Sequence, residues 1–464
     1  MSLEVVSIIV FIVVFLLATM ISINMGVLAL IAAFVLGTVA LHQSAEEIFA
    51  GFPGDLFVTL VGVTFLFAIA KSNGTVDWLV RAGVRAVGGR VAAIPWVMFL
   101  VSAVLSAVGA VVPAAVAIMA PVGISFARKH GINPLLMGLM IITGTTAGGF
   151  SPISIFGTIT NGVVERNDLP SSPLTLFLAT FLYNAALAVI AYFLFGGRKL
   201  MHASASAVEA RRSAEPVAVA EPAHASSGGG PSSGDASSPG GALGSSSSSA
   251  EAGDVGEDHD EDPAERLDLN RALTVVGLLG LTVGALFFGL NVGAVALIVG
   301  ALLTMVSPKS AQGAVNGVSW STVLLVCGIV TYVSVLQNIG TIDFLGEQVS
   351  QLGIPLLAAL LICLIGGAVS AFASTTGILG ALIPLAVPFL LGGEIGAVGL
   401  IAALAISSSV VDSSPFSTSG ALVTANAPED MRDMVFRRLM AWGLSLILLA
   451  PLSTWLILVL PGWL

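Results

Sequence analysis

The sequence contains little charge. Lys, Arg, Asp and Glu make up 9% of its 464 residues, whereas they make up about a quarter of an ordinary soluble domain. Apolar residues account for 56%, and the mean hydropathy is +1.01. This composition excludes a soluble globular enzyme, because one protein core cannot hide so much apolar surface and lipid must cover most of it. We therefore expect an all-α polytopic membrane protein.

Cysteine and histidine are also scarce. The two cysteines, Cys327 and Cys363, lie inside apolar runs, so the sequence offers neither a disulfide framework nor a metal-ligand spacing. None of the five histidines lies within a predicted span beside a nucleophile or a metal ligand. These absences argue against redox chemistry, a zinc site and a membrane-embedded hydrolase. We expect no enzymatic activity and no cofactor apart from sodium ions.

Acidic residues outnumber basic ones by 27 to 17, but the excess is local. Thirteen of the acids fall between Glu209 and Asp268. This part of the chain is rich in Ser, Gly and Ala and cannot bury enough apolar surface to fold. We predict that residues 200–268 form a disordered acidic linker.

Apolar runs divide the rest of the chain. A membrane span needs about 20 apolar residues, and fewer where the membrane thins. Two apolar stretches, about 92–127 and 354–391, are interrupted in their middles and are considered separately. Ten runs qualify as spans, at approximately residues 5–23, 26–41, 56–72, 133–163, 174–196, 272–289, 293–306, 321–337, 395–425 and 438–460.

The chain contains an internal repeat. Four segments of the first half recur in the same order in the second half, at offsets of 263 to 267 residues. Ordered matches at nearly one offset predict that residues 1–199 and 269–464 share one fold. The matching pairs are residues 24–31 and 291–298, residues 74–79 and 340–345, Pro121 and Pro384, and residues 151–154 and 414–417.

Basic residues indicate the orientation in the membrane. If each half has five spans, the second half enters the membrane upside down. With the N-terminus outside, all the Lys and Arg residues except Arg166 lie on the inner side. This distribution predicts ten spans in the inner (plasma) membrane of the cell, both termini outside and a cytoplasmic linker. Each interrupted stretch is then a re-entrant hairpin, the first from the cytoplasm and the second from outside.

Two predicted spans are broken at equivalent places. Residues 143–152 put three glycines and a proline within a span, and residues 407–415 put hydroxyls, a carboxylate and the matching proline there. A break frees carbonyls suited to a cation on one half-helix and N–H groups suited to an anion on the other. Paired breaks in inverted halves point to the substrate site of a transporter. The alternative is a plain proline kink with small residues for close packing.

Asp412 is the only carboxylate well within a predicted span. Such a residue is a functional hypothesis by default. It could bind sodium, or exchange a proton if burial raises its pKa, and its alternative role is to cap the following half-helix. We predict that the coupling cation or proton is held at the two breaks by Asp412, Gly148, Gly149, Ser409 and Ser413.

The two hairpin tips differ in polarity. The second tip contains Ser374, Thr375, Thr376 and Gly377, whereas the first contains residues 109–113, which are Gly-Ala-Val-Val-Pro. We expect an asymmetric site in which hydroxyls of the second half hold the substrate and the first half offers mainly backbone groups. For any single Ser or Thr, a hydrogen bond back to its own helix is the common alternative.

Two halves that each contain a hairpin and a Ser-Pro-broken helix resemble the ion transporter superfamily that contains divalent anion/sodium symporters. The part up to about Lys199 is most similar to MatC-type malonate or dicarboxylate carriers. The resemblance implies a homodimer with a scaffold and a moving portion that work as an elevator. It also implies substrate or cation contacts by Ser151, Ile153, Ser154, Ser374, Thr375, Thr376, Ser414 and Ser417.

The function that these observations predict is secondary active transport of a small dicarboxylate, malonate by resemblance, with sodium or protons. The predicted site contains no Arg or Lys, so half-helix N-termini, hydroxyls and bound cations would hold the anion. A cation/proton antiporter of the same fold, centred on Asp412, stays open. An anion channel is disfavoured because polarity is confined to the midplane elements. The expected partners are the substrate, the lipid bilayer and a second copy of the chain, and no nucleic acid is expected.

Overall fold

The structure is a computed structural model that describes residues 2–20, 23–85, 91–200, 268–341, 344, 355–371, 375–391 and 395–462. Apart from its first residue and Asp268, the predicted linker lies outside these residues. Within the described part of the chain, every regular element is a helix.

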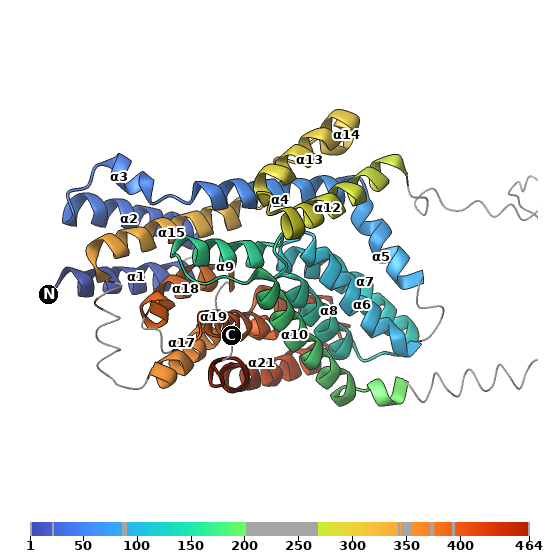
Figure 1. The fold of residues 1–464 in the computed structure, drawn as a ribbon. Coiled ribbons are helices and arrows are strands. Elements are labelled where there is room, and N and C mark those ends of the chain that lie inside the picture. The colour runs from blue at the N-terminus through green and yellow to red at the C-terminus, as the bar shows by residue number, and fades with distance from the viewer. Residues whose placement is uncertain are drawn as a thin grey trace, which may run out of the picture. The chain divides into compact units, whose positions relative to one another are not determined.

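The helices of the first half begin with α1 and end with α10 (Figure 1). They are α1 (Leu3–Met20), α2 (Met25–Ala40), α3 (Ala45–Ala50), α4 (Gly54–Ser72), α5 (Thr75–Arg85), α6 (Ile94–Ala107), α7 (Val112–His130), α8 (Pro134–Gly148), α9 (Ile155–Arg166) and α10 (Pro173–Leu194).

The second half follows the same order. Its helices are α12 (Leu269–Phe288), α13 (Val292–Val306), α14 (Pro308–Ala311), α15 (Trp320–Ile339), α17 (Pro355–Ser370), α18 (Thr375–Leu391), α19 (Ala397–Ser409), the 3-10 turn η2 (Val410–Ser413), α20 (Thr418–Asn426) and α21 (Arg432–Thr454), which continues as a π-helical turn over Trp455–Val459.

Six stretches of described helix are long and apolar enough to cross a membrane. They are Gly54–Ser72, Val112–His130, Pro173–Leu194, Trp320–Ile339, Ala397–Asn426 and Arg432–Val459, and shorter apolar helices accompany them. The chain is therefore a polytopic α-helical membrane protein. The prediction of ten spans treats Val112–His130 as one arm of a hairpin, and that topology stays a prediction.

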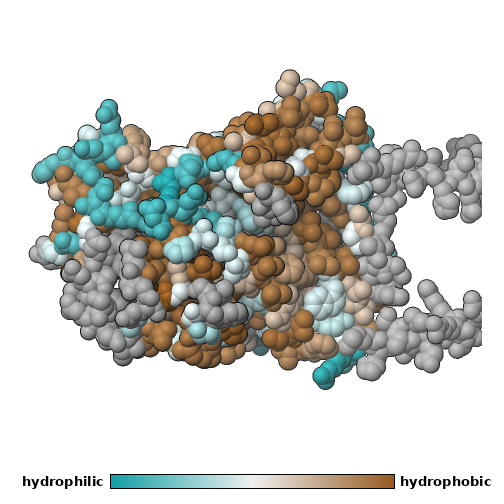
Figure 2. Space-filling view, in the orientation of Figure 1, coloured by the Kyte–Doolittle hydropathy of each residue, from teal (hydrophilic) through white to brown (hydrophobic). Residues whose placement is uncertain are grey.

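Large apolar side chains cover much of the outer surface. Figure 2 shows an apolar surface over the region of α12 and α13. Val276 and Leu279 of α12, and Leu302 and Met305 of α13, are more than half exposed. Water would penalise such a surface, whereas lipid solvates it.

Matching caps start two equivalent helices. The Asn24 side chain accepts a hydrogen bond from the Gly26 N–H at the start of α2, and the Asn291 side chain accepts one from the Ala294 N–H at the start of α13. Asparagine is favoured at this position because it satisfies an N–H that the first helical turn leaves free. The two caps are 267 residues apart, as the repeat predicts.

Glycines let four long helices pack in two close pairs. Gly26 of α2 lies against Gly328 of α15, and Gly293 of α13 lies against Gly62 of α4. A Cβ atom at any of the four would come within 2.0 to 2.6 Å of a backbone atom of the partner helix. Small residues at helix crossings are typical of membrane proteins. In lipid the hydrophobic effect does not drive helices together, so close packing of their backbones stabilises the contact instead.

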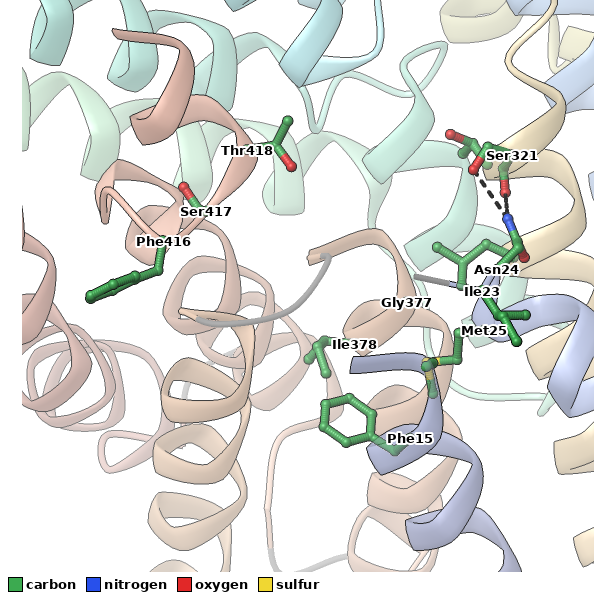
Figure 3. A pocket seen from close by; sticks show the side chains of 13 residues that line it. Phe15, Ile23, Asn24, Met25, Ser321, Gly377, Ile378, Phe416, Ser417 and Thr418 are labelled. Carbon is green, nitrogen blue, oxygen red and sulfur yellow. Dashed lines mark hydrogen bonds between the residues drawn. The ribbon is translucent and has the colours of Figure 1, made fainter. Parts of the chain in front are cut away.

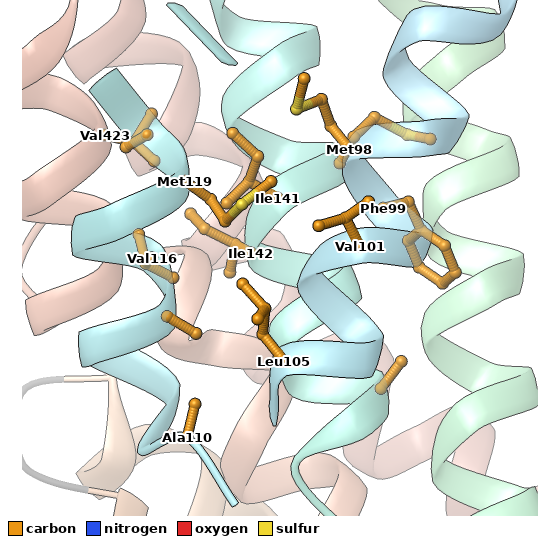
Figure 4. Packing of buried hydrophobic residues seen from close by; sticks show 14 of the residues in the cluster. Met98, Phe99, Val101, Leu105, Ala110, Val116, Met119, Ile141, Ile142 and Val423 are labelled. Atoms are coloured by element: carbon orange, nitrogen blue, oxygen red, sulfur yellow. The ribbon is translucent and has the colours of Figure 1, made fainter. Parts of the chain in front are cut away.

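The first hairpin, α6 and α7, packs around α8 (Figure 4). Gly144 and Gly148 of α8 lie against the backbone of α6, where an added Cβ would come within 2.3 and 1.9 Å of the carbonyl oxygens of Phe99 and Ala103. The buried side chains that join these helices to α20 include Met98, Leu105, Val116, Met119, Ile141, Ile142 and Val423. In Figure 1, α17 of the second hairpin lies at the opposite end from α5 and the outer ends of α6 and α7.

Candidate functional site

The structure confirms both predicted helix breaks. α8 ends at Gly148 and α9 begins at Ile155, while α19 ends at Ser409 and α20 begins at Thr418. The two breaks have nearly the same internal geometry. The Ser154 hydroxyl donates to the Ser151 carbonyl at 2.7 Å, and the Ser417 hydroxyl donates to the Ser414 carbonyl at 2.8 Å.

The same two serine hydroxyls each contact a second backbone carbonyl within their break. Ser154 is also within hydrogen-bond reach of the Gly149 carbonyl, and Ser417 of the Asp412 carbonyl. Ser417 further accepts a hydrogen bond from the Gly420 N–H at 3.2 Å and so caps α20. Since both hydroxyl hydrogens point to backbone carbonyls, a contact of either serine with substrate stays a prediction.

Two glycines that the sequence analysis missed are required by this geometry. A Cβ atom on Gly157 would lie 2.0 Å from the Ser151 carbonyl oxygen, and one on Gly420 would lie 2.0 Å from the Ser414 carbonyl oxygen. Real side chains do not tolerate such an approach to backbone. Both glycines lie three residues after the closing serine, so extending the repeat comparison by three positions would have found them.

Asp412 lies in the turn η2 with 6% of its surface exposed. Its Oδ1 accepts a hydrogen bond from the Thr375 hydroxyl at 2.7 Å, and that hydroxyl lies 2.9 Å from the Ser370 Oγ. The alternative role of Asp412 as the cap of the following half-helix is wrong, because Ser417 caps α20. The carboxylate instead links the second break to the tip of the second hairpin.

The first break is also bonded to its own hairpin. The Ser151 hydroxyl donates to the carbonyl of Ala107, the last residue of α6, at 2.6 Å. At the repeat offset of 263, Gly149 stands at the position of Asp412 and Val112 at the position of Thr375. Of the two described breaks, the second alone therefore carries this polar cluster of Asp412, Thr375 and Ser370.

The two serines among the predicted coupling residues form hydrogen bonds within their own helix turn. The Ser409 hydroxyl donates to the Ile406 carbonyl at 3.3 Å, and the Ser413 hydroxyl donates to the Val410 carbonyl at 2.8 Å. Both serines are buried. These bonds back to the preceding turn are the usual behaviour of serine in membrane helices.

The remaining predicted substrate residues lie close to the breaks. Ser414 accepts a hydrogen bond from the Phe416 N–H at 3.3 Å, while Ile153 and Thr376 are buried. Ser374 lies outside the described residues. A cluster of three or more His, Cys, Asp or Glu side chains that could hold a metal ion is absent from the described part of the chain.

A cavity of about 390 Å³ reaches the second break (Figure 3). Figure 3 shows Ser417 and Thr418 on one side of it, with Asn24 and Ser321 on the other. The Asn24 side chain donates to the Ser321 carbonyl at 2.9 Å and to its Oγ at 3.1 Å. The other lining residues are Phe15, Ala18, Ile23, Met25, Thr322, Leu325, Gly377, Ile378 and Phe416.

A second cavity, of about 380 Å³, reaches the tip of the first hairpin. Its walls include Gly109 and Val111 of that tip, Thr64 and Lys71 of α4, and residues that precede α15. Sequence reasoning had singled out Ser417 and the two hairpin tips, but not the other walls of the cavities, because these come from helices distant in the chain. The cap residue Asn24 had been noticed only as part of the repeat.

A comparison with known protein families identifies the first part of the chain. Residues 1–149 match the family described as dicarboxylate carrier protein MatC N-terminus. This part of the chain is therefore similar to the amino-terminal part of dicarboxylate carriers of the MatC type. The matched segment runs from α1 through the first hairpin to the first residue of the first break. No curated protein matches the chain significantly.

The match over residues 1–149 and the helix content together support a dicarboxylate transporter. The predicted resemblance to MatC-type carriers is confirmed over residues 1–149. The placement in the wider ion transporter superfamily stays a prediction.

Proposed function

We propose that this MatC-type protein is a secondary active transporter that moves a small dicarboxylate, such as malonate, by alternating access with sodium or protons. The observation that carries the coupling proposal is the buried bond between Asp412 and Thr375. It places the one carboxylate of the predicted spans between a broken helix and a hairpin tip. If a carboxylate at membrane depth binds a cation or proton, that binding affects the positions of both the broken helix and the hairpin tip.

Repeated contacts support two inverted halves, residues 1–199 and 269–464. Gly26 and Gly293 are repeat partners, and so are Gly62 and Gly328. Each pair makes the same close contact, but α2 of the first half packs on α15 of the second, while α13 of the second packs on α4 of the first. Such reciprocal contacts arise when two copies of one fold are related by a two-fold axis.

The N-termini of the second half-helices offer a place for the anion. The first two N–H groups of α9, on Ile155 and Phe156, and those of α20, on Thr418 and Ser419, have no hydrogen-bond partner among the described residues. Unpaired N–H groups and the helix dipole favour negative charge. Thr418 also lines the larger cavity, so a carboxylate of a substrate in that cavity could reach the N–H groups at the start of α20.

We further propose an elevator-type movement in a homodimer, in the inner (plasma) membrane of the cell. In this arrangement the glycine-packed pairs α2 with α15 and α4 with α13 belong to the scaffold. The hairpins and broken helices move together, since each hairpin tip is bonded to its own break. Both termini lie outside, and the linker lies in the cytoplasm.

Uptake by the purified full chain in liposomes tests the proposed function. Malonate, succinate and citrate are offered under imposed sodium or proton gradients, with acetate and protein-free liposomes as controls. We expect saturable uptake of at least one dicarboxylate above its equilibrium level under one of the gradients. Cation exchange that proceeds equally without any dicarboxylate would instead establish an antiporter, and uptake that never exceeds equilibrium would contradict coupling.

A further inference from the structure

We propose that Asp55, Arg166, Asn167 and Gln337 form a latch that closes one side of the carrier, and that the described structure is open on the other side. This inference rests on the proposed function, because a latch between two access states has a role only in an alternating-access protein.

The latch joins the end of α9 to two other helices. Arg166, the last residue of α9, forms an ion pair with Asp55 in the first turn of α4. The Gln337 amide near the end of α15 donates to the Asn167 side chain at 2.7 Å. Two consecutive residues therefore tie the second half-helix of the first break to α4 and α15, whose glycine contacts fix them against α13 and α2.

The two ends of α4 and α15 differ in accessibility. Asp55 starts α4 and Gln337 lies near the end of α15, so both belong to the latched end. The opposite ends of these helices carry Lys71 and Ser321, which line the cavities of about 380 and 390 Å³ that reach the two hairpin tips. At the latched end, a smaller cavity of about 190 Å³ has walls from the ends of α9 and α15, and its described walls include neither a break nor a tip.

The repeat explains why one end alone is latched. At the offset of 266 between the starts of α4 and α15, Ser321 stands at the position of Asp55. At the offset of 263 between the starts of α9 and α20, Glu429 stands at the position of Arg166. A hydroxyl and a carboxylate cannot form the ion pair, and Ser321 lines the open cavity instead. The end that lacks the ion pair is the end that is open.

Two hydroxyls behind the latch also indicate a path that opens. Thr158 and Thr160 of α9 lie between the first break and the latch, and their buried hydroxyl oxygens have no hydrogen-bond partner among the described residues. An unsatisfied buried hydroxyl is costly. Water that enters when the latch end opens would form hydrogen bonds with these hydroxyls. These hydrogen bonds would stabilise the state that is open at this end, and the closed state lacks them.

Cysteine labelling of the full chain in liposomes tests the latch. Thr158→Cys is combined with Asp55→Asn, with Arg166→Gln, or with the swapped pair Asp55→Arg and Arg166→Asp. The chain without Thr158→Cys measures the background from the native cysteines, both of which are buried. Glu165→Gln removes a neighbouring charge outside the latch and serves as the matched control.

We expect each single latch variant to accelerate labelling of Thr158→Cys from the latch side by about two- to five-fold, the range that a partly exposed ion pair allows. The swapped pair should return the rate toward that of the parent, and Glu165→Gln should not change it. Equal labelling rates in the parent and in both single variants would overturn the latch, and so would faster labelling in the control alone.

A cross-link between Asp55→Cys and Arg166→Cys, made with a bifunctional thiol reagent that reduction cleaves, gives an independent test. We expect cross-linking to stop dicarboxylate uptake and cleavage of the reagent to restore it, because the cross-linked latch end can no longer open. Undiminished uptake by the cross-linked protein would overturn the latch while leaving the proposed function intact. Absence of dicarboxylate uptake in the unmodified parent would contradict the proposed function, and the labelling rates would still report on the latch.

Discussion

At the scale of single residues, each break is shaped by a serine and a glycine that follow its proline. The hydroxyl of this serine donates a hydrogen bond to a carbonyl at the start of the break. The glycine lies three residues after the serine, and its lack of a side chain leaves room for the same carbonyl. Ser151, Ser154 and Gly157 do this in the first half, and Ser414, Ser417 and Gly420 in the second. The chemistry of the second break then comes from a single added carboxylate, Asp412.

Substitution of the break glycines should destabilise the protein. We expect Gly157→Ala and Gly420→Ala each to lower the free energy of unfolding by about 1 to 3 kcal/mol, because the new methyl group overlaps a carbonyl oxygen. Gly280→Ala on α12 is the matched control, since nothing lies within 4 Å of its added Cβ. Thermal unfolding in detergent measures the difference, and equal effects at all three positions would contradict this account.

The Thr375 hydroxyl should matter for coupling more than for folding. Thr375→Val keeps the shape of the side chain but removes the donor to Asp412. Loss of a hydrogen bond to a charged group is worth about 1.5 to 3 kcal/mol, so the half-saturating sodium or proton concentration should change about tenfold or more. Thr375→Ser retains the hydroxyl and should behave like the parent, and an identical cation response in Thr375→Val would refute the role.

At the scale of elements, the helix breaks could be predicted from the sequence, whereas the direction of individual hydroxyls could not. Glycine and proline within an apolar run mark a break by their backbone chemistry alone. Ser154, Ser409 and Ser413 were predicted to face substrate or cation, but their hydroxyls bond to backbone carbonyls. A serine in an apolar helix carries no sequence signal for this choice.

Short surface helices and distant contacts were the other features that sequence patterns did not reveal. α3 was not predicted, although Ser44 and Glu47 form the reciprocal capping box that starts it. The ion pair of Arg166 with Asp55 joins residues 111 positions apart. In the sequence, Arg166 stood out only as the one basic residue on the outer side.

Cysteine accessibility tests the predicted topology of the helices. With ten spans and two hairpins, cysteines introduced at Ser2 and after Leu464 should both react with an impermeant reagent from outside intact cells. A cysteine at Ser232 in the linker should react only after the membrane is permeabilised. Labelling of one terminus from each side would mean that a hairpin crosses the membrane, and the inverted arrangement of the halves would then be wrong.

At the scale of the whole molecule, the two halves contribute unequally to one site. Both supply a hairpin, a broken helix and unpaired half-helix N–H groups, and the second half adds the carboxylate and the hydroxyl bonded to it. The family match covers the part that ends at the first break. The polar cluster that we assign to coupling therefore lies in the part of the chain beyond that match.

The linker should be dispensable for transport. Deletion of residues 210–260 removes most of the predicted linker and keeps the two halves joined, so we expect most uptake into liposomes to remain. The amount of inserted protein is measured in parallel as the control. A well-inserted deletion variant without uptake would show that the acidic segment is needed for transport itself.

The most direct test of coupling at the second break compares two transport modes in Asp412→Asn. This change keeps the size of the side chain and most of its hydrogen bonding but removes its charge. We expect uphill dicarboxylate uptake under a sodium or proton gradient to be lost, while exchange of external for internal dicarboxylate continues. Uphill uptake with the parent's cation and pH dependence in Asp412→Asn would contradict the central claim that this carboxylate couples transport to the cation or proton.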